Sequence, residues 1–351
     1  MTFQRTYLDY NSTTPLSSQA RSAMLEVMNA VGNASSVHWE GRWAKGVIET
    51  AREQISESLD APGSRLIFTS GATESAAILL KDRGICCSRV EHPCVSFWCE
   101  TNLQATENGE VKVTEPSKST VQLANSETGI IQELPENLYM SDVVQGVGKI
   151  DFSFQNCGAK AVIISAHKLG GPAGVGAVLL DSSTEVFPLL GGGGQESGYR
   201  SGSENIIAIA GFGAAVEFEI KKLNEGVWER VRELRDYLEN ELNYISEDTM
   251  FVGRNTFRLP NTSCIVTPNW KGETQVMQMD LRGFAISSGS ACSSGKVTSG
   301  ETLRSLGFEA GLVDCAIRVS LGSETKKEDI EAFLKEWQKA YKSNKGNIRK
   351  Q

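Results

Sequence analysis

The sequence predicts an α/β fold with a large, mainly parallel sheet and a smaller α+β domain beside it. The first two hundred residues alternate short apolar runs with helical patterns, which is typical of strand–helix units in such a sheet. Polar clusters follow several of the apolar runs, at the edge where open α/β sheets bind ligands. The chain has 351 residues, and a single hydrophobic core rarely serves a chain of this length, so the length favours two domains.

Four apolar runs in the first half of the chain predict the strands of the larger domain. They are Arg65–Thr69, Val121–Ala124, Ala161–Ile164 and Gly176–Leu180. A helical stretch ending near Leu80 follows the first run. The run at 161–164 is apolar throughout, as expected of a strand that is buried on both faces.

The second half predicts a long helical region from about Ile206 to Leu242, and then strands near 262–266 and 317–320. A last helix should begin at a capping box formed by Thr325 and Glu328. Its core-facing stripe has helical spacing and comprises Ile330, Phe333, Leu334, Trp337 and Tyr341. We therefore expect a large domain over residues 16–225 and a small α+β domain over residues 1–15 and 226–351.

Composition and charge narrow the functional class. Apolar residues make up 40% and charged residues 22%, as in globular proteins, and the formal net charge is −8. This charge argues against nucleic acid or an anionic membrane as the main partner. The first residues form no apolar signal segment, and no run of eighteen apolar residues occurs. We expect a cytoplasmic protein.

Lys168 is the most informative residue, because it follows a buried strand within the run SAHKLGGP. Desolvating an unpaired ammonium costs several kcal/mol, so a lysine at this place is rarely structural. A lysine that forms a Schiff base needs such partial desolvation to act as a nucleophile. The alternative is a lysine whose amine extends from the strand end into solvent.

Other polar residues suggest a site near this lysine. The run from Ser70 to Thr73 can hold a phosphate, because Gly71 permits close approach and a helix start offers free N–H groups; an ordinary capped helix is the alternative. Asp142 lies in an apolar stretch, where it suits a protonated heteroaromatic nitrogen, a helix cap or a salt bridge. The three histidines, His38, His92 and His167, all lie in candidate site loops.

The eight cysteines form no CxxC pair, so zinc and dithiol redox sites are weakly supported. Cys264 and Cys315 lie in strand-like runs and should be small core residues, and Cys94 and Cys99 allow the same interpretation. Cys292 differs, because it is surrounded by glycine, serine and alanine.

Together, these segments resemble the class I cysteine desulfurases (NifS/IscS-like), which are fold-type I pyridoxal phosphate enzymes related to class V aminotransferases. The resemblance extends from Tyr7 to about Tyr341. It rests on ordered motifs that include YLDYNSTTP, GNASSVH, TSGATES, NSETG, SAHKLGGPAGVGA, GGGQESGYRSGSEN and SSGSACSSG. The form SSGSAC around Cys292 resembles the first class of these enzymes. The resemblance implies the PLP-transferase (aspartate aminotransferase-like) fold.

The resemblance also implies roles for individual residues around pyridoxal 5'-phosphate. Lys168 would form the Schiff base, Asp142 would pair with the pyridinium nitrogen, Gln145 would contact the ring hydroxyl, and His92 would stack on the ring and move protons. The phosphate would be held by the N–H of Ala72 and by the side chains of Thr73, Ser165, His167 and, from a neighbouring subunit, Ser203.

The same resemblance implies that Arg318 and Asn33 bind the carboxylate of L-cysteine and that Cys292 accepts its sulfur as a persulfide. L-Alanine would be the second product. The Cys292 loop would belong to the small domain. A homodimer is implied, as is a sulfur-acceptor or scaffold protein of iron–sulfur cluster or thio-cofactor biosynthesis. No metal site is predicted.

The sequence departs from the family pattern at Ser126, which replaces an asparagine that contacts cofactor or substrate, and at Met140, which replaces a common histidine. Ala34 and Ala77 also differ, and several connections are shorter. Two alternatives stay open beside the desulfurase, and Ser126 and Met140 motivate the second of them. One is a selenocysteine lyase or another class V β-eliminating enzyme, and the other is a degenerate subunit that only binds a partner.

Overall fold

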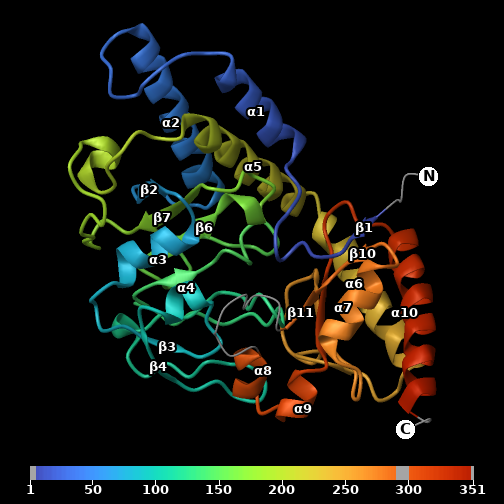
Figure 1. Ribbon diagram of the computed structural model, residues 1–351. Helices are drawn as coiled ribbons and strands as arrows, with labels where there is room; N and C mark the ends of the chain where they lie inside the picture. The colour runs from blue at the N-terminus through green and yellow to red at the C-terminus, as the bar shows by residue number, and fades with distance from the viewer. Residues whose placement is uncertain (1–4, 290–299, 349–351) are drawn as a thin grey trace.

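The computed structural model describes residues 5–289 and 300–348 (Figure 1). The central sheet of the larger part has the strand order β2-β7-β6-β5. Strands β5 and β6 are parallel, whereas β7 is antiparallel to both β2 and β6. The bounds are Arg65–Thr69 for β2, Ser141–Asp142 for β5, Ala161–Ser165 for β6 and Gly176–Leu180 for β7.

Further parallel pairing extends this sheet beyond β5. The Leu123 N–H donates to the Asp142 carbonyl at 2.8 Å, and the Thr120 N–H donates to the Cys86 carbonyl at 2.9 Å. This connection reaches the parallel pair β3 (Cys86–Ser88) and β4 (Glu100–Leu103). The predicted α/β fold with a mainly parallel sheet is confirmed, with β7 as its antiparallel member.

The predicted strand 121–124 forms only part of this connection. It hydrogen bonds to the chain at Met140 and Asp142 but is not a regular strand. The side chain of Asn125 ends the pairing, because its Oδ1 accepts the N–H groups of Glu127 and Thr128 and closes a turn.

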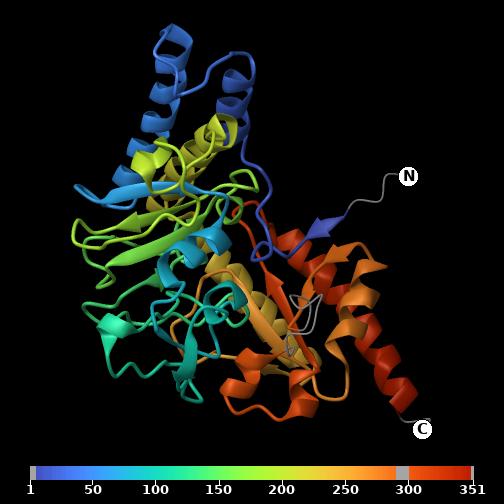
Figure 2. The ribbon, with the colours of Figure 1, turned by 60° about the vertical axis from the view of Figure 1, so that its left-hand side comes forward.

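Helices cover both faces of the central sheet (Figure 2). In β6, Val162 and Ile164 pack in the same core as α2 and α5, whereas Ala161 and Ile163 pack with α3. This alternation explains why the run is apolar throughout. The helices are α1 (Ser18–Met28), α2 (Trp39–Ser58) and α5 (Ile206–Asn224) on one side, and α3 (Ala72–Leu80) and α4 (Pro93–Ser96) on the other.

The helical region predicted over 206–242 consists of two helices, because Gly226 interrupts it with a left-handed backbone at φ 75°. Helix α6 (Val227–Ile245) then packs against a second, antiparallel sheet of order β11-β12-β9-β8. Its strands are β8 (Met250–Phe251), β9 (Thr262–Val266), β11 (Ser287–Ser288) and β12 (Ala316–Ser320).

The remaining elements complete the smaller part. The parallel pair β1 (Thr6–Tyr7) and β10 (Phe284–Ala285) lies beside α7 (Gly272–Asp280) and α10 (Lys327–Ile348). The short helices α8 (Glu301–Ser305) and α9 (Ala310–Val313) follow the undescribed segment. Three 3₁₀ turns span Pro116–Lys118, Ala166–Lys168 and Gln195–Gly198.

The predicted stripe of α10 is buried in the core of the smaller part, which confirms it. The predicted capping box is wrong. The carboxylate of Asp329, not that of Glu328, accepts the N–H of Lys326, and Thr325 Oγ1 instead accepts the N–H of Gly322. Thr325 thereby closes the turn before the helix, so the cap lies one residue later.

The N-terminal segment connects the two parts. Tyr10 N–H donates to the carbonyl of Ser320 in β12, and Thr14 N–H donates to the carbonyl of His167 in the larger part. Residues 9–14 therefore lie between the two sheets. In the part of the chain that the structure describes, no helix combines the length and apolar content needed to cross a lipid bilayer.

Candidate active site

The amine of Lys168 is held inside the protein by the N-terminal segment. Nζ donates to the carbonyl of Asn11 at 2.6 Å and to that of Ser12 at 2.8 Å. Lys168 ends the 3₁₀ turn after β6, and Gly170, at φ 71°, turns the chain away behind it. The strand end and these two carbonyls therefore direct the amine into a cavity rather than into solvent.

Asp142 lies in β5, the parallel neighbour of β6, and its carboxylate is buried in the same cavity. Oδ1 accepts the N–H of Val144 at 3.0 Å. Burial raises the pKa of Asp142, and the nearby His92 and Lys168 partly offset this rise. Among the residues that the structure describes, no ion pair compensates this carboxylate.

His92 lines the same cavity as the N-cap of α4. Its Nδ1 accepts the N–H of Cys94 at 3.2 Å and lies 3.0 Å from Cys94 Sγ. Burial lowers the pKa of His92, and the charge of Lys168 lowers it further, against the attraction of Asp142. The imidazole is therefore neutral near pH 7 and can accept a proton there.

Gln145 connects the lysine to a second buried amine. Its Nε2 donates to the Asn11 carbonyl at 3.0 Å, which is the acceptor that Lys168 also uses. Lys149 Nζ donates to the Gln145 carbonyl at 2.9 Å and approaches Oε1 at 3.4 Å. Burial, reinforced by the charge of Lys168, lowers the pKa of Lys149 to about 7. Lys149 was not predicted from the sequence.

The start of α3 forms a concave polar surface at the cavity. Gly71 precedes the helix with φ 151°, a backbone that a side chain rarely adopts, and no side chain caps the helix. Thr73, Ser165 and His167 also line the cavity there. Burial, with Lys168, lowers the pKa of His167 to about 4, so this ring is neutral at pH 7. An uncapped helix start surrounded by hydroxyl groups suits a phosphate.

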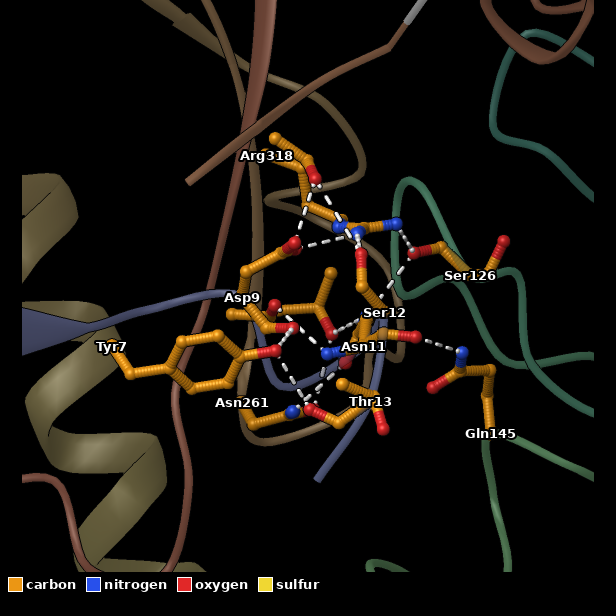
Figure 3. A network of polar contacts seen from close by, with 12 residues as sticks. Tyr7, Asp9, Asn11, Ser12, Thr13, Ser126, Gln145, Asn261 and Arg318 are labelled. Carbon is orange, nitrogen blue, oxygen red and sulfur yellow. Dashed lines mark hydrogen bonds and ion pairs between the residues drawn. The ribbon is translucent and has the colours of Figure 1, made fainter. Parts of the chain in front are cut away.

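Arg318 reaches the cavity from β12 in the smaller part (Figure 3). Nη2 donates to Asp9 Oδ1 and to Ser12 Oγ, both at 2.7 Å. Nη1 donates to the carbonyl of Ser126 at 3.0 Å. The predicted contact residue Ser126 thus touches Arg318 through its backbone carbonyl, and it also lines the cavity.

The cavity has a volume of about 420 Å³, within the usual range for small-molecule sites. Most predicted site residues line it, namely Ala72, Thr73, His92, Ser126, Asp142, Gln145, Ser165, His167, Lys168 and Arg318. The sequence interpretation assigned no role to Asn11 or Ser12, although the motif YLDYNSTTP contains both. Cys94 also lines the cavity, whereas a core position was suggested; Cys264 and Cys315 are core residues as predicted.

Two predicted residues lie elsewhere in the single chain. Asn33 is exposed, its Oδ1 accepts the N–H of Ser35, and it does not line the cavity. Ser203 is exposed beside a separate pocket. Cys292 lies outside the described residues. The roles of these three residues stay predictions.

The residues present fit pyridoxal phosphate. The uncapped start of α3 provides N–H groups for a phosphate, and Lys168 provides an amine directed into the cavity. The Asp142 carboxylate is buried without an ion-pair partner in the described ranges 5–289 and 300–348, which suits a protonated ring nitrogen. These groups surround one cavity and define the class of pyridoxal phosphate enzyme sites at the ends of strands in an α/β sheet.

Comparison with known proteins gives the family. The chain belongs to the aminotransferase class-V family, whose pattern matches residues 6–333. It is 34% identical to the cysteine desulfurase IscS of Dictyoglomus turgidum, over 93% of this chain and 92% of the relative. It is 32% identical to the IscS-like cysteine desulfurase of Mycobacterium tuberculosis, over 93% of this chain and 94% of the relative.

Solved structures agree with this assignment. The NifS-like protein of Rickettsia africae has a TM-score of 0.88 and 30% identity, covering 97% of this chain and 100% of that one. A second NifS-like protein has a TM-score of 0.86 at 27% identity, over 97% and 100% of the two chains. The predicted family and fold are confirmed. Members of this family depend on pyridoxal phosphate, which is the cofactor of this chain.

Proposed function

We propose that this protein is a cysteine desulfurase that converts L-cysteine to L-alanine and moves the sulfur to Cys292. The observation that carries the proposal is the cavity that gathers the amine of Lys168, the carboxylate of Asp142 and the guanidinium of Arg318. The guanidinium would bind the carboxylate of an α-amino acid, while the lysine and the aspartate would hold the cofactor that takes up its amine. The names of relatives that are 32–34% identical support the same activity.

Each described residue has a task that its surroundings support. Pyridoxal phosphate, when bound, withdraws electrons from the substrate's α-carbon. Asp142 would keep a proton on the ring nitrogen, because a buried carboxylate is stabilised by a cation beside it. Ala72, Thr73, Ser165 and His167 would hold the phosphate, and Gln145 the ring hydroxyl. His92, which is neutral at pH 7, would stack on the ring, and accept and return a proton.

The proposed sulfur transfer needs no oxidant, reductant or other reactant besides L-cysteine and Cys292. The Cys292 thiolate would attack the sulfur of L-cysteine, forming a sulfur–sulfur bond while the bond from sulfur to the β-carbon breaks. The electron pair released to carbon is protonated, which gives the methyl group of L-alanine. Cys292 keeps the transferred sulfur as a persulfide. A thiol has a pKa near 8.5, so a base such as His92 or the incoming amine must take its proton.

We also propose the quaternary and cellular setting that the resemblance implies. A homodimer would bring Ser203 of one subunit to the phosphate of the other, and Asn33 would complete the carboxylate site. The persulfide would pass to an acceptor or scaffold protein of iron–sulfur cluster or thio-cofactor assembly in the cytoplasm. Residues 16–225 would form one domain, and residues 1–15 and 226–351 the other.

The proposal is tested by the release of L-alanine and sulfide from L-cysteine with a thiol reductant, in the wild type, Cys292→Ala and Cys157→Ala. Cys157 is a matched control, because its thiol donates to the Phe154 carbonyl and does not line the cavity. Wild type and Cys157→Ala should release both products, and Cys292→Ala should release neither. Peptide mass spectrometry should find one added sulfur atom on Cys292 after a single turnover.

Other outcomes of this experiment reject the proposal in identifiable ways. If Cys292→Ala is as active as the wild type, sulfur leaves by direct elimination, as in a lyase. If selenocysteine is also turned over faster than cysteine, the enzyme is a selenocysteine lyase. A wild type that binds the cofactor through Lys168 yet releases no alanine, even with candidate acceptor proteins, would indicate a subunit without desulfurase activity.

A further inference from the structure

Ser12 connects the two cationic groups of the site, Lys168 and Arg318, and Figure 3 shows its contact with Arg318. Its carbonyl accepts a hydrogen bond from Lys168 Nζ at 2.8 Å, and its hydroxyl accepts one from Arg318 Nη2 at 2.7 Å. Both cations and Ser12 line the same cavity. One residue of the N-terminal segment therefore contacts both the lysine that would bind the cofactor and the arginine that would bind the substrate's carboxylate.

The charge of Arg318 is already compensated by the protein. Asp9 Oδ1 lies 2.7 Å from Nη2, and the Arg318 side chain is only 5% exposed. Such a pairing lowers the cost of burying the guanidinium, but it also weakens its attraction for a second anion. A carboxylate bound here would depend on well-placed hydrogen-bond donors more than on net charge.

Arg318 and Ser12 each keep a hydrogen-bond donor for a carboxylate. Arg318 Nε is buried and has no hydrogen-bond partner in the described part of the chain. The Ser12 hydroxyl accepts from Arg318, so its own proton points to another acceptor. The acceptor beside it is Ser287 Oγ at 3.5 Å, which is long for a hydrogen bond between two hydroxyl groups. The Ser287 hydroxyl itself donates to Asp9 Oδ2 at 2.9 Å.

We propose that Ser12 is a substrate-binding residue that donates its hydroxyl proton to the α-carboxylate of the amino acid, beside Arg318. This hydrogen bond favours the binding of α-amino acids over that of amines that lack the carboxylate. This inference rests on the proposed function, because it assumes that Arg318 faces the substrate's carboxylate.

The experiment compares two ligands that differ only in the carboxylate. L-Alanine and ethylamine are titrated into the pyridoxal phosphate holoenzyme by calorimetry, in the wild type and in Ser12→Ala. Loss of a hydrogen bond to a charged group should weaken L-alanine about tenfold. Ethylamine should bind Ser12→Ala as it binds the wild type, because it has no carboxylate to accept the proton of the Ser12 hydroxyl.

Steady-state rates give the second readout. With L-cysteine, Ser12→Ala should raise KM about tenfold and change kcat less than twofold, as expected for a contact made equally in the ground and transition states. Unchanged L-alanine binding, or equal weakening of both ligands, would overturn the role of Ser12. A wild type that binds L-alanine but does not desulfurate L-cysteine would instead refute the proposed function.

Discussion

His92 Nδ1 lies 3.0 Å from Cys94 Sγ and also accepts the Cys94 N–H at 3.2 Å. Burial raises the pKa of Cys94, so its sulfur remains a protonated thiol that can donate a hydrogen bond. An Nδ1 that accepts hydrogen bonds leaves the ring proton on Nε2. The residue two positions after the histidine therefore places the ring proton on Nε2, and a proton accepted by His92 would replace the hydrogen bond from the Cys94 thiol at Nδ1.

This contact predicts the protonation of His92. In ¹⁵N-histidine-labelled holoenzyme, NMR should find the Nε2–H form, with a pKa below 6.5. Cys94→Ala should raise this pKa, because the neutral ring loses a donor, and Cys94→Ser should restore it. The chain has only three histidines, so His38→Gln and His167→Gln assign the signals. A protonated Nδ1 in the wild type would contradict the prediction.

Lys149 predicts a pH dependence of stability. Its pKa is about 7 in the folded protein against an ordinary 10.5, so between these values unfolding takes up a proton. The free energy of unfolding then rises with pH, by at most about 1.4 kcal/mol per pH unit. Urea unfolding of holoenzyme at pH 7 and 9 should show this slope in the wild type and lose it in Lys149→Met.

Lys221 provides the control for this experiment, because its side chain is 70% exposed. Lys221→Met should follow the wild-type slope. If Lys149→Met also follows it, the amine of Lys149 is charged in the folded protein at pH 7 to 9, and the lowered pKa is wrong.

Gly71 predicts a backbone effect on cofactor binding. A β-carbon there meets no atom within 4 Å, so the cost of Gly71→Ala comes from φ 151° and not from a clash. We expect a loss of about 1–3 kcal/mol in the free energy of unfolding. Pyridoxal phosphate affinity should fall as the helix start shifts. Gly46→Ala, in the open middle of α2, should instead stabilise by about 0.5–1 kcal/mol. Equal effects of the two changes would contradict this explanation.

The Arg52–Glu196 ion pair should stabilise the loop that leads to Ser203. Glu196 accepts two hydrogen bonds from Arg52, at 2.9 and 3.1 Å, and one from the Phe68 N–H at 2.8 Å, and its side chain is 3% exposed. Glu196→Gln should lower the free energy of unfolding by about 2–3 kcal/mol, because Arg52 loses its buried partner. Thermal unfolding and proteolysis of the loop would measure this effect.

Glu229→Gln is the matched control, since Glu229 pairs with Arg232 on the surface, where both side chains are more than half exposed. Its effect should stay below about 1 kcal/mol. If Glu196→Gln and Glu229→Gln lower the free energy of unfolding by the same amount, the burial of Glu196 does not make its ion pair more stabilising, which contradicts the prediction.

Local sequence patterns predicted those elements of the fold whose residues are chosen mainly by burial. The strand 161–164 and the stripe of α10 follow from burial alone, and both are observed. The antiparallel direction of β7 was not predictable, because it depends on which strands pair and not on the run of apolar residues. The interruption at Gly226 could have been predicted, since a glycine inside a helical pattern is a common helix end.

In the candidate site, too, some residues were predictable from local sequence patterns and others only from the tertiary structure. The strand-end lysine and the helix start with glycine were recognisable, because unusual residues stand in a regular pattern. Asn11 and Ser12 hold the amine of Lys168 through their backbone carbonyls, which any residue possesses, so this role gave no signal in the sequence. Lys149 contacts Gln145 one helical turn earlier in sequence, yet its low pKa comes from burial that only the tertiary structure creates.

The N-terminal segment has a consequence for synthesis. Asn11 donates its N–H to Ser320 Oγ, and its carbonyl holds the amine of Lys168. These partners lie 309 and 157 residues further along the chain. During translation the segment emerges before both partners, and the later one follows only after a further 309 residues have been added. The active site is therefore closed by a segment that is made long before its partners, so a functional lysine pocket reports that the chain from Asn11 to Ser320 has been made and folded.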